Sequence, residues 1–140
     1  MAAALVEMAA RFGDLPHERA AALRARALEL ADGELGAYAP VLEAQRSRDR
    51  DRVAEALSQA ADSPMEIARA AAEVAELGAS VARDGKEAIK GDALVGVVLA
   101  EAACRAAARL VSINLAGTPD DPRLAEAAEF ERRAAASVPI

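Results

Sequence analysis

Aromatic residues are nearly absent from this sequence of 140 residues. They make up 2% of it, with one tyrosine, two phenylalanines and no tryptophan, although hydrophobic residues account for 54%. Alanine therefore supplies much of the apolar content, and alanine favours the helix more than any other residue. The 8 glycines and 6 prolines are too few for many tight turns. This composition predicts an all-α fold.

The smaller number of basic than acidic residues and the low content of cysteine disfavour several functional classes. The net charge of −6 leaves no basic footprint for nucleic acid. Four arginines between residues 46 and 52 alternate with two aspartates, and we interpret them as a solvated helix junction. A single cysteine excludes an internal disulfide and suits a reducing cytoplasm, where we expect the protein. The N-terminus has no signal-peptide pattern, and the length suits one domain spanning residues 1–140.

The longest apolar run covers residues 91–115, GDALVGVVLAEAACRAAARLVSINL. Its first half carries no charge after Asp92, and Glu101, Arg105 and Arg109 then follow at four-residue spacing on one helical stripe. A helix that is apolar nearly all round is buried on several sides. Glu101 interrupts the run too early for a membrane span. We therefore predict the central helix of the fold here, with no membrane association.

The remaining apolar periodicity predicts the helices that pack around this central helix. Proline, glycine and capping residues divide the chain into helices at 2–12, 16–46, 49–61, 63–84 and 122–136. Gly36 and Pro40 predict a bend in the second of them, since proline lacks a backbone donor and clashes one turn back. The expected fold is an up-and-down bundle of five to six helices around the central one.

Neither the histidine nor the cysteine suggests a catalytic centre. His17 is the only histidine, and without spaced partner ligands it forms no metal site. Cys104 lies in the apolar part of the central helix, where a thiol behaves as a small hydrophobic group. We predict a solvated first-turn role for His17, a core role for Cys104, and no metal.

Three acidic residues each allow a structural and a functional reading. Asp92 can be the N-cap of the central helix, or a carboxylate at a helix mouth that transfers a proton. Asp32 and Glu34 lie beside the predicted bend. They can belong to a solvated face, or act as acid or base if they point inward.

Long segments of the sequence resemble the formimidoyltetrahydrofolate cyclodeaminase and methenyltetrahydrofolate cyclohydrolase family. The matching segments are SPMEIARAAAEVAELGASVARDG, GDALVGVVLAEAACRAAARLVSINL, LRARALELADGELGAYAPVLEAQR and MAAALVEMAARF, which together span nearly the whole chain. The most distinctive positions are Pro64, Gly85, Asp92 and the Ile113-Asn114-Leu115 ending.

The resemblance implies an all-helical homodimer that binds a reduced folate near the subunit contact. The substrate would be a tetrahydrofolate derivative, undergoing cyclodeamination of 5-formimidoyltetrahydrofolate or hydrolysis of 5,10-methenyltetrahydrofolate without a metal. Asp92 matches the family's acid before the central helix, which implies proton transfer. Glu34 stands where the family has an aspartate, and implies a second catalytic acid. Asp32 and Tyr38 are the implied substrate-binding residues.

The sequence also departs from the family pattern. Members of the family have a Pro-Gly-Gly-Gly-Ser loop ahead of the first helix, whereas this sequence begins within that helix. Lys86, Glu87 and Ala88 replace an asparagine-rich turn, and Gly91 replaces a serine. Two functions therefore remain open: a folate enzyme acting by general acid–base catalysis, or a non-catalytic helical dimer that serves as a folate-binding or interaction module.

Overall fold

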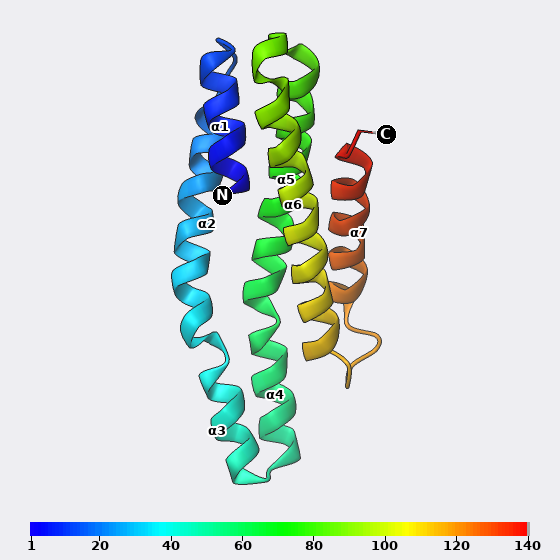
Figure 1. Ribbon diagram of the computed structural model, residues 1–140. Coiled ribbons are helices and arrows are strands. Elements are labelled where there is room, and N and C mark those ends of the chain that lie inside the picture. The colour runs from blue at the N-terminus through cyan, green and yellow to red at the C-terminus, as the bar shows by residue number, and fades with distance from the viewer. Residues whose placement is uncertain (140) are drawn as a thin grey trace.

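The computed structural model describes residues 1–139, except for the side chains of residues 34 and 35. This part of the chain contains seven helices and no strand, so the all-α prediction is confirmed (Figure 1). The helices are α1 (Ala2–Phe12), α2 (Glu18–Ala37), α3 (Ala39–Ser47), α4 (Arg50–Ala60), α5 (Asp62–Asp84), α6 (Glu87–Asn114) and α7 (Pro122–Ser137).

The long helices run up and down beside one another, as predicted. In Figure 1, α5 and α6 form the central antiparallel pair, α1 and α2 flank one side, and α7 covers the other. The α3–α4 hairpin extends beyond the lower end of α6. The central position expected for the apolar helix is therefore shared by α5 and α6.

Small residues allow the central helices to approach closely. A Cβ placed on Gly78 of α5 would lie 2.8 Å from Cγ2 of Val97 in α6, and one on Gly96 would lie 2.8 Å from Cγ2 of Val6 in α1. Such distances leave no room for an added methyl group. The alanine-rich composition thus has a structural consequence, since helix axes can come together only where side chains are short.

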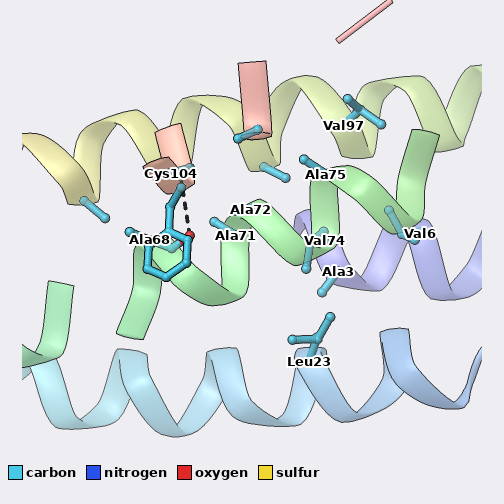
Figure 2. Close-up of a cluster of buried hydrophobic side chains, with 14 of the residues drawn as sticks. Ala3, Val6, Leu23, Ala68, Ala71, Ala72, Val74, Ala75, Val97 and Cys104 are labelled. Atoms are coloured by element: carbon cyan, nitrogen blue, oxygen red, sulfur yellow. Dashed lines mark hydrogen bonds between the residues drawn. The ribbon is translucent and has the colours of Figure 1, made fainter. Parts of the chain in front are cut away.

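The main core is correspondingly built of alanine, valine and a few larger side chains (Figure 2). Ala68, Ala72 and Ala75 of α5 are fully buried. Cys104 is also fully buried, and its thiol donates a hydrogen bond to the carbonyl oxygen of Ala68 at 3.4 Å. Burial raises the pKa of this thiol to about 11. The predicted core role of Cys104 is confirmed.

Two predicted helix boundaries are wrong. The segment 16–46 is not one helix: α2 ends at Ala37 and α3 begins at Ala39, so the bend predicted between Gly36 and Pro40 is a break at Tyr38. The central helix begins at Glu87 with Lys86 as its N-cap residue, so Asp92 lies inside the helix and is not its N-cap. The reason is that Ile89 is buried against the α1–α2 turn, which draws this segment into the helix.

The upper half of α6 is also less buried than its composition predicts. Ala93, Gly96, Val97 and Ala100 are buried, but Val95 and its neighbours on the opposite side are exposed. At the other end of the helix, the Asn114 amide donates to the carbonyl oxygen of Ala60 at 3.1 Å. Asn114 therefore satisfies a carbonyl group at the end of α4.

Candidate functional site

An apolar cavity of about 380 Å³ lies between α2, α5 and α6, and the first turn of α1 closes one end. Its larger lining side chains are Leu23, Leu30, Ile67, Val74 and Leu99. All of the residues that line it are apolar. The cavity can therefore hold a flat or aliphatic body, while any polar recognition has to come from its margins.

Ion pairs lie at the margin of this apolar cavity. Arg26, next to the lining residue Ala27, contacts Glu29 at 3.2 Å and Glu66 at 3.7 Å. Glu66 also accepts a hydrogen bond from Arg69 at 2.6 Å. These side chains are partly exposed, so their charges remain accessible to solvent or to a ligand.

Asp92 lies above the apolar cavity, on the same stripe of α6. It precedes the lining residue Leu99 by seven positions, which corresponds to about 10 Å along a helix. The side chain is exposed, and no hydrogen bond or ion pair joins it to another described residue. Because Asp92 is not a cap, its carboxylate is available for another role.

The other residues singled out from the sequence lie toward the lower end of α2. Asp32 directly follows the lining residue Ala31 and is exposed. Tyr38, at the α2–α3 junction, is 47% exposed. Glu34 belongs to α2, but its side chain lies outside the described residues.

Within one chain, these residues do not form a single cluster with Asp92. The start of α6 lies beside the α1–α2 turn, because Ile89 packs against Gly13. Asp92 is three positions beyond Ile89, whereas Asp32 is fourteen positions beyond the start of α2, about 21 Å along that helix. The two carboxylates therefore lie toward opposite ends of the apolar cavity.

Exposed apolar side chains gather on the outward sides of α1 and α6. We call this the outer face; it consists of Met8 and Phe12 in α1, and Val95 and Val98 in the upper half of α6. Phe12 is 73% exposed, and the two valines are each 51% exposed. Asp92 is on the same side of α6, one turn before Val95. Exposed apolar side chains that lie together can form an interaction surface.

Sequence reasoning missed one acidic residue in α1. Glu7 is only 7% exposed, and its carboxylate accepts a hydrogen bond from Nε of Arg24 at 2.6 Å. Arg11 approaches the same carboxylate at 3.7 Å. Its spacing in the helix could have indicated burial, because Glu7 is four residues after Ala3 and three before Ala10, and both alanines are buried.

His17 occupies the N-cap position of α2, one residue before the first turn, and is half-buried rather than fully solvated as predicted. In the described part of the chain, no three His, Cys, Asp or Glu side chains come together in a way that could hold a metal ion. The described helices also include none with the length and apolarity needed to cross a bilayer.

The model of the Formiminotransferase-cyclodeaminase family matches residues 1–134. The chain belongs to this family. The match covers nearly all of the sequence, including every residue singled out above for folate chemistry. The resemblance noted from the sequence segments is therefore confirmed.

The fold is similar to that of formiminotetrahydrofolate cyclodeaminase from Thermotoga maritima, with a TM-score of 0.82. The two chains share 24% sequence identity, and the match covers 99% of this chain and 76% of the other. At this identity the likeness establishes the shared fold. No curated protein sequence matches the chain.

Proposed function

We propose that the protein is a subunit of a folate one-carbon enzyme, either a formimidoyltetrahydrofolate cyclodeaminase or a methenyltetrahydrofolate cyclohydrolase. The family membership of residues 1–134 carries this proposal. The solved structure with the same fold is described as a formiminotetrahydrofolate cyclodeaminase, which supports the first alternative.

The apolar cavity is the proposed position of the reduced folate. Its volume of about 380 Å³ and its apolar walls suit the flat aromatic parts of such a molecule. No side chain of the lining is polar, so the polar edges of the ligand would meet side chains at the margin. Asp32 and Tyr38 at the lower end, and Glu34 near them, are the proposed contacts.

Asp92 is the proposed proton-transfer residue. In ring closure, N10 attacks the formimidoyl carbon and loses a proton, while the departing nitrogen gains protons and leaves as ammonia. In the cyclohydrolase reaction, water adds to the methenyl carbon and gives up a proton, and one C–N bond of the ring then breaks. Both reactions need a group that accepts and returns a proton, and a carboxylate near a folate would serve. Glu34 is the proposed second acid.

The outer face is proposed to bind a second copy of this chain. Its four side chains are apolar and exposed, and Asp92 precedes Val95 by one turn of α6. An isologous contact would let the partner's surface cover Asp92 and the upper end of the apolar cavity.

The test is a pair of absorbance assays for wild type and two variants. One assay follows formation of 5,10-methenyltetrahydrofolate from the formimidoyl substrate, and the other follows its hydrolysis. Asp92→Asn is the catalytic variant, and Asp120→Asn is the matched control, since Asp120 is an exposed aspartate in the α6–α7 loop. We expect turnover well above the spontaneous rate in wild type and control, and a loss of about 10²–10⁴-fold in Asp92→Asn.

A different outcome would favour the second function kept open by the sequence. The apolar cavity contains no acid or base, which is the observation that favours a non-catalytic folate-binding or interaction module. If the folded protein bound reduced folate but left both substrates at their spontaneous rates, that function would replace the enzymatic one. Turnover that survives in Asp92→Asn would keep the enzyme and remove Asp92 from its chemistry.

A further inference from the structure

A second cavity, of about 350 Å³, lies at the lower end of the molecule, and we call it the hairpin cleft. It is enclosed by the end of α3, the start of α4, and the segment that follows α6. Its apolar lining comes from Val53, Leu57 and Leu115. The hairpin cleft and the apolar cavity share no lining residue. They are separated along α6, since Leu99 and Asn114 are about 22 Å apart along the helix.

The polar side of the hairpin cleft carries two arginine side chains. Arg48 and Arg50 line it, and neither forms an ion pair with a described side chain. Most other arginines of this acidic chain have such a partner; examples are the pairs of Arg69 with Glu66, Arg123 with Asp121, and Arg133 with Glu76. The guanidinium groups of Arg48 and Arg50 are therefore available to an anion, although the protein has a net charge of −6.

The acid beside these arginines is already engaged. Asp49 also lines the hairpin cleft, but its Oδ1 accepts hydrogen bonds from the backbone N–H groups of Asp51 and Arg52 as the N-cap of α4. Gln45, at the other side, contributes an amide that can both donate and accept. An incoming anion would thus meet two guanidinium groups and an amide.

The backbone of the cleft is held in an unusual conformation. Arg48 adopts the left-handed region, with φ of 58°, which a non-glycine residue enters at a cost. Arg48 lies in the turn between α3 and α4. These two helices pack against each other through a small core of their own, made of Val41, Ala44, Ala56 and Ala60. The turn presents the Arg48 and Arg50 side chains at the margin of the cleft rather than along one helix.

We propose that the hairpin cleft binds a small organic anion with an apolar ring and one carboxylate or phosphate group. The ring packs on Val53, Leu57 and Leu115, and the anionic group pairs with Arg48 and Arg50. Guanidinium groups bind both kinds of anion through paired hydrogen bonds. Because the cleft joins the α3–α4 hairpin to the end of α6, such a ligand would also fix the hairpin against the bundle.

The experiment is isothermal titration calorimetry of the full chain with three probes of similar shape: 2-naphthoate, 2-naphthyl phosphate and the neutral 2-naphthamide. We expect at least one anion to bind ten times or more tightly than the amide. Preference between the two anions identifies whether a carboxylate or a phosphate is the natural group. Equal affinity for the amide, or no binding of any probe, would overturn the proposal.

Variants then locate the binding. The double variant Arg48→Gln, Arg50→Gln should weaken anion binding at least tenfold, and Ala54→Trp should block it, since exposed Ala54 lines the cleft. The matched control, Arg83→Gln with Arg132→Gln, removes the same charge from exposed positions elsewhere. Anion binding that these cleft variants leave unchanged, or that the control weakens equally, would place it outside the hairpin cleft. The result does not depend on folate turnover.

Discussion

The carboxylate of Glu7 in α1 accepts a hydrogen bond of 2.6 Å from Nε of Arg24 in α2, and the two partners differ in burial. The Glu7 side chain is 10% exposed, whereas that of Arg24 is 47% exposed. Removing the arginine leaves a buried carboxylate with only Arg11 nearby, but removing the glutamate leaves a guanidinium that can turn to water.

Arg24→Ala should therefore destabilise the fold more than Glu7→Ala does. We expect a loss of about 2–3 kcal/mol in the free energy of unfolding for Arg24→Ala, and about 1 kcal/mol for Glu7→Ala. Urea denaturation of both variants measures the difference. Equal losses, or a larger loss for Glu7→Ala, would contradict the burial assigned to this pair.

Gly78→Ala tests the close approach of the central helices. The added Cβ would lie 2.8 Å from Val97 and 3.0 Å from Val6, so we expect a destabilisation of about 1–3 kcal/mol from overpacking. Gly33→Ala is the matched control inside α2, because no neighbouring atom lies within 4 Å of its added Cβ. The control should gain about 0.5–1 kcal/mol from helix propensity. Thermal unfolding measures both variants. Melting temperatures that shift in the same direction for Gly78→Ala and Gly33→Ala would contradict the close packing at Gly78.

Asp121 provides a test in acid. Hydrogen bonds from Arg123 lower the pKa of this carboxyl from 3.8 to about 2. A carboxyl with a lowered folded-state pKa contributes stability that is fully present above its unfolded pKa and is lost as the pH falls toward the folded value. Asp121→Asn keeps an oxygen that can cap α7 but removes the charge.

The stability difference between wild type and Asp121→Asn should therefore be constant above about pH 5 and should shrink between about pH 4 and pH 2. Urea denaturation at a series of pH values measures it. A difference that stays constant through this range would show that Arg123 does not perturb Asp121.

Val98→Asp tests the outer face as a contact between two copies. Val98 is a half-exposed residue of the outer face, so a carboxylate buried there in a dimer would oppose association. We expect wild type to sediment as a dimer and the variant as a folded monomer in analytical ultracentrifugation. Ala125→Asp, at an exposed position of α7, is the control and should remain dimeric. A wild-type monomer at all concentrations would remove the dimer from the proposal.

The parts of the fold with strong local signals were predictable from the sequence. Gly13, Gly85 and Pro122 are each at or next to a helix end in the structure. The start of α6 was not predictable, because burial of Ile89 against the α1–α2 turn outweighs the helix-breaking tendency of Gly91. Local propensity carries no information about that tertiary contact.

The candidate site shows the same limit. Asp92 was singled out for its apparent position as a cap, and that position was wrong, although the residue remains exposed beside the outer face. The apolar cavity depends on how far α1 extends along α6, which no periodicity encodes. Glu7 was not predicted as a buried residue, because an acidic residue in an alanine-rich helix is normally exposed. Its burial depends on the packing of α2 against α1, which the local sequence does not indicate.

Folate binding by the apolar cavity is the claim on which the proposed enzymatic function rests. The most direct measurement is a calorimetric titration of a stable reduced folate, 5-formyltetrahydrofolate, into wild type and two tryptophan variants of α2. Ala31→Trp fills the cavity from its exposed edge, and Ala25→Trp places the same side chain on the solvent side of the helix. We predict binding to wild type and Ala25→Trp, and a loss of at least tenfold in affinity for Ala31→Trp. Equal binding by all three proteins, or binding by none, would contradict the account.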